Sequence, residues 1–214
     1  MAIILSSYYF GPVQAFCHML RSDKIFVEQH DNYSRRTFRN RTTILVANGP
    51  MNLTVPVIKP KEKTKTKDIR ISYDTNWQKN HWRSVVSAYN SSPFFEYYRD
   101  DIIHIYEKKW DFLIDLNIET LRRTIEMLDL EIEIEFSNEY LDPAGISAED
   151  LREVIIPKKA PEIYDSSFKP VRYRQVFSET MDFVPNLSIL DLIFNKGPEA
   201  THILEQSHKM RLIE

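Results

Sequence analysis

AIILSSYYFGPVQAFCHMLRSDKIFVEQ, residues 2–29, contains the strongest fold signal in the chain. Residues 2–7 form a short apolar run, which is typical of a buried first strand. Pro12 then suits the first turn of a helix that runs to about Arg21. Residues 24–29 predict a second strand. A strand, a turn, a helix and a strand at this spacing predict a βαβ unit with two parallel strands and a right-handed connection.

Outside this unit, the clearest local signal is that of a β-hairpin. Residues 42–47 and 51–58 flank Asn48-Gly49, a dipeptide that favours a tight turn between antiparallel strands. Pro56 lies inside the second arm and has no backbone amide proton to donate. We therefore expect that arm to lie at the edge of a sheet.

Three segments with helical periodicity follow, over residues 76–89, 93–109 and 117–128. Together they predict a helical layer that spans roughly residues 76–129. Residues 131–136 alternate glutamate with isoleucine and phenylalanine, which predicts a half-buried strand.

The C-terminal part of the chain has weaker patterns. Residues 137–172 are polar and contain several prolines, so we expect a long irregular excursion, followed by a short strand at 173–177. Ser188 predicts the start of a helix, and a last helix follows Pro198. With 214 residues and no internal repeat, the chain is expected to form a single domain, residues 1–214.

Composition narrows the function classes. The formal net charge is −3 and the hydrophobic fraction is 43%, which predicts a globular protein without the broad basic surface that nucleic-acid binding usually needs. A single cysteine, Cys17, excludes disulfides within the chain and cysteine-based metal sites. No secretory signal is recognisable at the start, and no apolar run is long enough to span a bilayer. We expect a soluble protein of a reducing compartment, most simply the cytoplasm.

The glycines exclude two common nucleotide-binding motifs. Gly11, Gly49, Gly145 and Gly197 are the only glycines, so neither a dinucleotide-binding fingerprint nor a Walker phosphate loop can be written. If a nucleotide binds, side chains and helix ends must hold it.

The segment YSRRTFRNR, residues 33–41, places four arginines within seven residues. Arginine suits phosphate and carboxylate ligands, because its planar fork donates two parallel hydrogen bonds. If the segment is extended, Arg35, Arg39 and Arg41 share one face, where they would repel one another unless an anion lies among them. This arrangement predicts a site for an anionic ligand. The alternative is a set of solvated arginines, or arginines paired with the nearby acidic residues Asp23, Glu28 and Asp31.

Two other features each leave two interpretations open. The lysine-rich segment at residues 59–67 is typical of a mobile solvated loop, and less often of a phosphate-binding loop. His81 lies within a predicted helix, where it either packs in the core or acts as a catalytic or ligand-orienting group. The other histidines have no metal-ligand spacing to each other, so we expect no zinc site.

Ser188 and Asp191 also have a structural and a functional interpretation. The structural one is a capping hydroxyl and a carboxylate that is favourable in the first turn of a helix. The functional one is a helix start that binds a phosphate with help from Ser188, while Asp191 acts as a base or holds an arginine of the 35–41 segment. Asn195 and Asn40 would then complete a polar pocket.

A series of short motifs, each present once, runs along the chain. In order they are Tyr9-Phe10-Gly11-Pro12, Asp23-Lys24, Tyr33-x-Arg35-x-x-Phe38-x-Asn40-Arg41, Leu53-Thr54-Val55-Pro56-Val57, Trp77-x-x-x-His81 running to Ala88-Tyr89, Pro93-Phe94, Asn117 with Leu121, and residues 187–195. In order and spacing they resemble the WbqC-like family, bacterial proteins often encoded among genes for O-antigen or other surface-polysaccharide synthesis. Ser6-Ser7 replaces the Gln-Pro that is common in the family, and the region after Phe136 is shorter. The chain therefore resembles a compact subtype.

These observations predict an α/β fold with a mainly parallel, Rossmann-like sheet, an antiparallel hairpin at its edge and a helical layer. The resemblance implies a transferase of surface-polysaccharide (O-antigen type) biosynthesis, and the arginines favour an anionic small-molecule donor that is nucleotide- or acyl-activated. We expect Arg35, Arg39 and Arg41 to bind the anion and His81 or Asp191 to act as general base. The remaining residues expected to bind the substrate are Asn40, Tyr89, Ser188 and Asn195. The alternative is a non-catalytic binding or scaffold protein of the same pathway, and the sequence assigns no cofactor and no oligomeric state.

Overall fold

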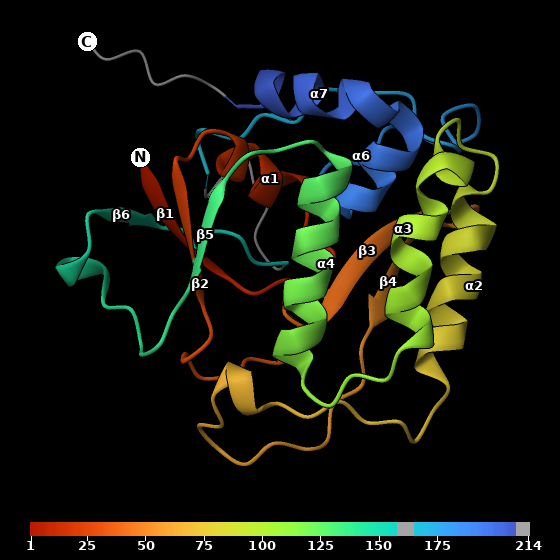
Figure 1. The fold of residues 1–214 in the computed structure, drawn as a ribbon. Helices are drawn as coiled ribbons and strands as arrows, with labels where there is room; N and C mark the ends of the chain where they lie inside the picture. The colour runs from red at the N-terminus through yellow and green to blue at the C-terminus, as the bar shows by residue number, and fades with distance from the viewer. Residues whose placement is uncertain (158–164, 209–214) are drawn as a thin grey trace, which may run out of the picture.

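The predicted N-terminal βαβ unit is present in the structure. The computed structural model describes residues 1–157 and 165–208 of the chain. β1 (Ala2–Ser6) and β2 (Lys24–Glu28) pair in parallel, and α1 (Val13–Leu20) connects them. Figure 1 shows these strands on the left, with α1 above them.

Two further strands complete a four-stranded parallel sheet in the order β5-β2-β1-β6. β5 (Glu133–Phe136) is the half-buried strand that its alternating pattern predicted, and it pairs with β2. β6 (Ala148–Asp150) pairs with β1. β6 lies in the stretch that was expected to be irregular. Its three residues are only partly buried, so they lack the apolar pattern of a core strand. That stretch also contains the 3-10 turn η2 (Pro143–Gly145), whereas the strand expected at 173–177 is absent.

The predicted hairpin is confirmed, but it forms a sheet of its own. β3 (Arg41–Val46) and β4 (Gly49–Thr54) pair antiparallel. This two-stranded sheet is separate from the parallel sheet, so the expectation of a hairpin at the sheet edge is wrong. Pro56, which suggested the edge position, lies beyond the end of β4 and does not interrupt the ladder.

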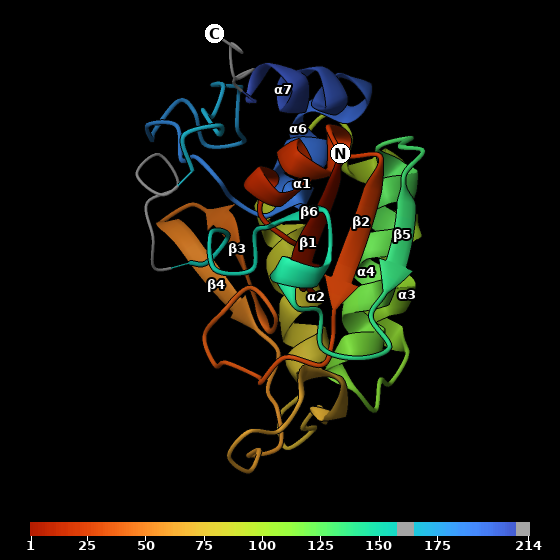
Figure 2. The ribbon, with the colours of Figure 1, turned by 90° about the vertical axis from the view of Figure 1, so that its left-hand side faces the viewer.

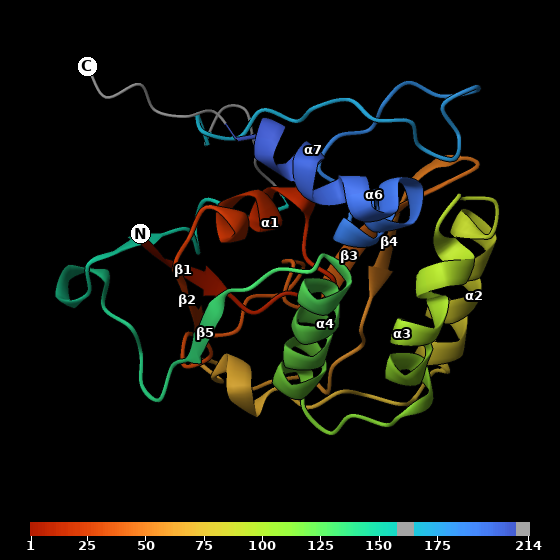
Figure 3. The same ribbon diagram turned by 45° about the horizontal axis from the view of Figure 1, so that its top comes forward.

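The helical layer is confirmed as three helices, α2 (Trp77–Tyr89), α3 (Phe95–Glu107) and α4 (Leu113–Met127). Figure 1 shows them side by side, with α4 nearest to the parallel sheet and α2 farthest from it. Two C-terminal helices, α6 (Ile189–Lys196) and α7 (Ala200–Gln206), lie next to α1 (Figure 3). None of the helices in the described ranges is both long and apolar enough to cross a membrane.

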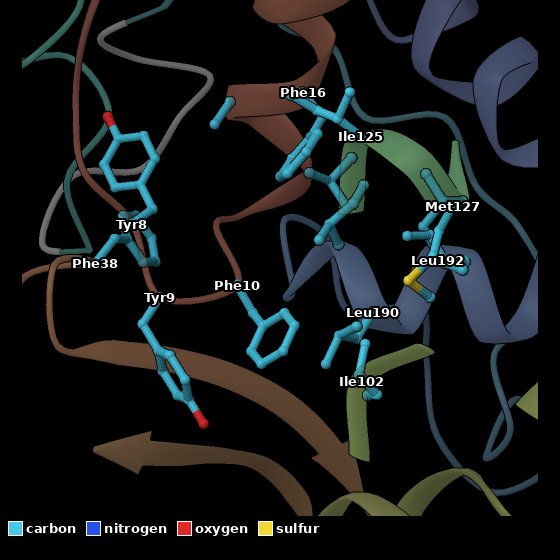
Figure 4. Packing of buried hydrophobic residues seen from close by; sticks show 14 of the residues in the cluster. Tyr8, Tyr9, Phe10, Phe16, Phe38, Ile102, Ile125, Met127, Leu190 and Leu192 are labelled. Carbon is cyan, nitrogen blue, oxygen red and sulfur yellow. The ribbon is translucent and has the colours of Figure 1, made fainter. Parts of the chain in front are cut away.

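The turn after β1 connects the parallel sheet to the C-terminal helix α6. The amide of Val13 donates to Leu187 O, and the amide of Ile189 donates to Gly11 O, both at 2.9 Å, so this turn is hydrogen-bonded to the start of α6. The side chains of Tyr8 and Tyr9 point in opposite directions from the turn in Figure 4. The Tyr8 ring packs edge-on against Phe38, with the ring centroids 6.2 Å apart. α6 lies at the centre of the fold, because it contacts α1, α3, α4 and β3.

Candidate functional site

A cavity of about 580 Å³ opens at the carboxyl edge of the parallel sheet. Its walls come mainly from the segments that follow β2, β5 and β6. β2 and β6 lie on opposite sides of β1, so the chain connections diverge at this edge, which is where open α/β sheets bind ligands. Figure 2 shows the segment from β2 to β3 leaving the arrowhead of β2 toward the hairpin. The lining residues are Asp31, Asn32, Ser34, Arg35, Arg36, Thr37, Arg39, Lys65, Tyr140, Glu153, Ile156 and Pro157.

The arginine-rich segment is turned, not extended as predicted. Residues 35–40 form turns, and Arg36 has a φ of +60°. This turn brings Arg35, Arg36 and Arg39 to the cavity. The predicted shared face of Arg35, Arg39 and Arg41 is therefore wrong, because Arg36 takes the place of Arg41. We call this space the cationic cavity, after its basic lining residues Arg35, Arg36, Arg39 and Lys65.

Asn40 and Arg41 lead the chain away from the cationic cavity into the hairpin. Asn40 Nδ2 donates to Val55 O at 3.1 Å, and the amide of Val55 donates to Asn40 O at 2.8 Å. Arg41 is the first residue of β3 and lies opposite Thr54. Neither Asn40 nor Arg41 lines the cavity, so the structure does not bring these two predicted residues to Arg35 and Arg39.

Arg39 has a structural role that accounts for its charge. Its guanidinium forms an ion pair with Asp31, and both side chains are largely buried. Thr66 Oγ1 also donates to Asp31, and Asn117 Nδ2 donates to Arg39 O at 2.8 Å. The salt-bridged interpretation of the arginine cluster is thus confirmed for Arg39.

Arg35, Arg36 and Lys65 differ from Arg39 in their electrostatics. Arg35 and Arg36 are exposed, and Lys65 is half-buried. None of these three side chains forms an ion pair with any of the residues that the structure describes. The lining holds four basic side chains, Arg35, Arg36, Arg39 and Lys65, against two carboxylates, Asp31 and Glu153. The excess of positive charge would be offset by a bound anion.

The lysine-rich segment is anchored beside the arginines. The amide of Tyr33 donates to Thr64 O at 3.0 Å, and the amide of Lys67 donates to Gln29 O at 2.9 Å. A β-bridge between Asn32 and Lys65 lies between these two bonds. The backbone contacts place Lys65 at the cationic cavity, which favours the phosphate-binding interpretation for this one lysine.

The segments after β5 and β6 that line the cavity are held by a buried ion network. Glu28 is fully buried at the end of β2, and it forms an ion pair at 3.1 Å with Arg152, which follows β6. Arg152 also pairs with Asp150 at 2.9 Å and donates to Leu141 O at 3.1 Å. The Arg152 guanidinium lies 5.0 Å from the ring centroid of Tyr140. Sequence reasoning missed Arg152 and Tyr140, because the strand that precedes Arg152 has no apolar signal.

Two buried phenols lie close to the Arg39–Asp31 pair. The hydroxyl oxygens of Tyr8 and Tyr33 have no hydrogen-bond partner within the described part of the chain. Burial raises the pKa of Tyr8, against the opposing charge of Arg39. Burial also raises the pKa of Tyr33 to about 12, against the opposing charges of Arg35 and Arg39. Both phenols therefore stay neutral at physiological pH.

His81 lies in the core, away from the cationic cavity. It is 6% exposed, its Nδ1 is 3.1 Å from Tyr9 Oη, and its ring packs edge-on against Trp77. Burial lowers the pKa of His81 to about 4, so the imidazole is neutral at physiological pH. These contacts agree with the packed interpretation. The general-base role stays a prediction, and His81 does not line the cavity.

We expect His81 to make the protein less stable in acid. Its pKa is about 4 when folded and about 6.5 when unfolded, so the unfolded state binds more protons between these values. Stability is therefore lost as pH falls from 6.5 toward 4. Between pH 7 and pH 4.5 this component is about 2.5 kcal/mol. Urea unfolding of the wild type and His81→Asn at both pH values measures it, and an unchanged difference between the two proteins would contradict the assignment.

Asp191 belongs to a second buried cluster. Tyr173 donates to its Oδ2 at 2.7 Å and Gln175 at 3.0 Å, so a tyrosine and a glutamine hold this carboxylate in place of the predicted arginine. Burial raises the pKa of Asp191 to about 6, and hydrogen bonds from Tyr173, Gln175 and Tyr89 oppose the shift. Asn195 Nδ2 donates to Asp191 O at 2.7 Å. Gln175 and Asn195 line a separate cavity of about 490 Å³.

Ser188 caps α6 as predicted. Its Oγ accepts from the amide of Leu190 and donates to Phe10 O at 3.1 Å. The predicted site residues therefore fall into separate places. Arg35 and Arg39 lie at the cationic cavity, Asn40 and Arg41 at the hairpin, and Asn195 at the separate cavity. The core holds His81, Tyr89, Ser188 and Asp191. Within residues 1–157 and 165–208, no three histidine, cysteine or acidic side chains are arranged to hold a metal ion.

The fold and the cavity define an α/β protein with a cationic cavity at the carboxyl edge of a parallel sheet. Residues 7–203 match the WbqC-like protein family, so the chain belongs to that family. It is also 27% identical over 227 residues to "Uncharacterized protein Rv1507c" of Mycobacterium tuberculosis (strain ATCC 25618 / H37Rv), covering 95% of this chain and 96% of the relative. No solved structure gives a significant match.

Proposed function

We propose that this protein is a transferase of surface-polysaccharide assembly that binds the phosphate-bearing part of an activated donor in the cationic cavity. The observation that carries the proposal is the gathering of Arg35, Arg36 and Lys65 without carboxylate partners in the described structure. Guanidinium groups suit phosphate because they donate paired hydrogen bonds. The assignment to surface-polysaccharide assembly is what the resemblance to the WbqC-like family implies.

The proposed chemistry uses these cations in the transition state. With a nucleotide-sugar donor, the acceptor hydroxyl bonds to the sugar carbon and loses its proton to water, while the bond from that carbon to the diphosphate breaks and leaves the negative charge on the departing diphosphate. Arg35 and Arg36 stabilise that charge as it develops, which is the form of electrostatic catalysis that fixed cations provide. With an acyl-CoA donor the thiolate departs instead, and the cations bind the phosphates without taking part in the transfer. His81 and Asp191 are buried elsewhere, so the geometry supports the anion-binding role before any general-base role.

Removing two arginines is expected to weaken anion binding without unfolding the protein. Arg35→Ala/Arg36→Ala should reduce the affinity for pyrophosphate and for phosphate-bearing donors about ten- to a hundredfold, since charge-assisted hydrogen bonds are lost. Both side chains are exposed, so the melting temperature should hardly change. Isothermal titration calorimetry measures the affinity.

The matched control is Arg83→Ala, an exposed arginine on α2 that does not line the cavity. It should bind as the wild type does. Failure of the wild type to bind any nucleotide, nucleotide-sugar, acyl-CoA or pyrophosphate would remove the basis of the proposal. Release of the donor's leaving group in the presence of a saccharide acceptor tests the transfer step itself.

The second candidate is a non-catalytic binding or scaffold protein of the same pathway. The buried Arg39–Asp31 pair favours it, because that arginine holds the fold and is not free for a ligand. Donor binding without turnover, over a panel of acceptors, would support this candidate over the transferase.

A further inference from the structure

Tyr140 presents an aromatic face at the cationic cavity. It lines the cavity and is 55% exposed, although it is a large aromatic residue. The Arg152 guanidinium covers one side of its ring, 5.0 Å from the centroid. The side of the ring away from Arg152 is therefore the side left for a planar group to stack upon.

The segment that contains Tyr140 is fixed by the buried ion network. The amide of Leu141 donates to Glu28 Oε2 at 2.7 Å, and Arg152 donates to Leu141 O at 3.1 Å. Asp142 then caps the η2 turn by accepting from the amide of Ala144. The backbone on the C-terminal side of Tyr140 is thus held before any ligand arrives, which favours binding because less ordering is needed.

We propose, resting on the proposed function, that the donor is a nucleoside diphosphate derivative whose base stacks on Tyr140. Its phosphates lie among Arg35, Arg36 and Lys65, which line the same cavity. Aromatic rings stack on nucleic-acid bases, and arginine side chains pair with phosphates, so both interactions are open to a protein without a glycine-rich loop. A cavity of about 580 Å³ falls in the size range of small-molecule and cofactor sites.

The apolar residues of the cavity support a planar ligand. Ile156 and Pro157 line it together with Tyr140, while the basic side chains lie on other segments. The carboxylates of the lining are Asp31, which pairs with Arg39, and Glu153. A base joined through ribose to a diphosphate has a planar part at one end and an anionic part at the other, as this lining would require. Nucleotide-sugars and acyl-CoA both contain this unit, so the shared chemistry is base, ribose and diphosphate.

The experiment compares ligands with and without a base. Isothermal titration calorimetry uses UDP-glucose, coenzyme A and pyrophosphate on the wild type, Tyr140→Ala, Tyr140→Phe and Tyr140→Leu. We expect Tyr140→Ala and Tyr140→Leu to weaken the base-bearing ligand about tenfold and to leave pyrophosphate unchanged. Tyr140→Phe should stay within about twofold of the wild type, because the ring is kept. Tyr97→Ala, which removes a tyrosine that is 76% exposed outside this cavity, is the matched control and should change nothing.

The outcomes separate this inference from the proposed function. One outcome would overturn the stacking inference and leave the anion site intact. In it, pyrophosphate binding depends on Arg35 and Arg36, UDP-glucose and coenzyme A bind no more tightly than pyrophosphate, and Tyr140→Ala has no effect. Absence of all binding would overturn both. Tight binding of UDP-glucose alone, or of coenzyme A alone, with loss in Tyr140→Ala, would support the inference and identify the source of the nucleotide unit.

Discussion

Replacing Glu28 with glutamine is expected to lower the free energy of unfolding by about 3–5 kcal/mol, the usual effect of breaking a buried ion pair from one side. The Glu28 carboxylate is fully buried and accepts four hydrogen bonds, two of them from Arg152 and the amide of Leu141. The Nε2 group of a glutamine at this position would face hydrogen-bond donors that now bind the carboxylate, so hydrogen bonds are lost as well as charge. Urea unfolding monitored by circular dichroism measures the change.

Asp150 provides a comparison on the same arginine. Arg152 pairs with Asp150 as well as Glu28, but the Asp150 side chain is 28% exposed and that of Glu28 is not exposed at all. Asp150→Asn should therefore cost about 1 kcal/mol or less, because water screens the exposed carboxylate. Glu107→Gln, an exposed change on α3, should be neutral. Equal effects of Glu28→Gln and Asp150→Asn would show that burial does not set the strength of this network.

The fold was predictable from sequence wherever the signal is local. The βαβ unit, the hairpin and the helices each have a contiguous pattern: an apolar run, a turn dipeptide, or a helical period, to which α6 adds a capping serine. β6 could not be predicted in this way, because Ala148–Asp150 becomes a strand through backbone pairing with β1. Its side chains contribute little to the core, so no apolar pattern marks it.

The cationic cavity was only partly predictable, because its geometry depends on one backbone angle and on distant residues. The arginine run is visible in the sequence, but a positive φ at Arg36 ends the extended geometry that a period of two assumes. A positive φ at a residue other than glycine leaves little trace in sequence. Arg152 lies 124 residues after Glu28 in the chain, so no local sequence pattern can predict the contact between them.

Replacing Gly197 with alanine is expected to lower the free energy of unfolding by about 3 kcal/mol, through two effects that add. Gly197 ends α6 with a φ of +52° and a ψ of −126°, a backbone conformation that residues with a side chain rarely adopt. An added Cβ would also lie 2.5 to 2.6 Å from three ring atoms of Phe94. These atoms include Cγ, close to the root of the side chain, so the whole ring would have to move. Chemical denaturation measures the loss.

Other glycines separate backbone strain from steric overlap. Gly145 has open space around it and no positive φ, so Gly145→Ala should stay within about 0.5 kcal/mol of the wild type. Gly49 has a φ of +111° and also open space, so Gly49→Ala should show backbone strain alone, about 1–2 kcal/mol. In a Phe94→Ala background, Gly197→Ala should fall to a similar value, because the overlapping ring is gone. If Gly197→Ala lowered the free energy of unfolding by as much in that background, the positive φ alone would explain the requirement for glycine. The Phe94 ring would then move aside in the single variant without loss of stability.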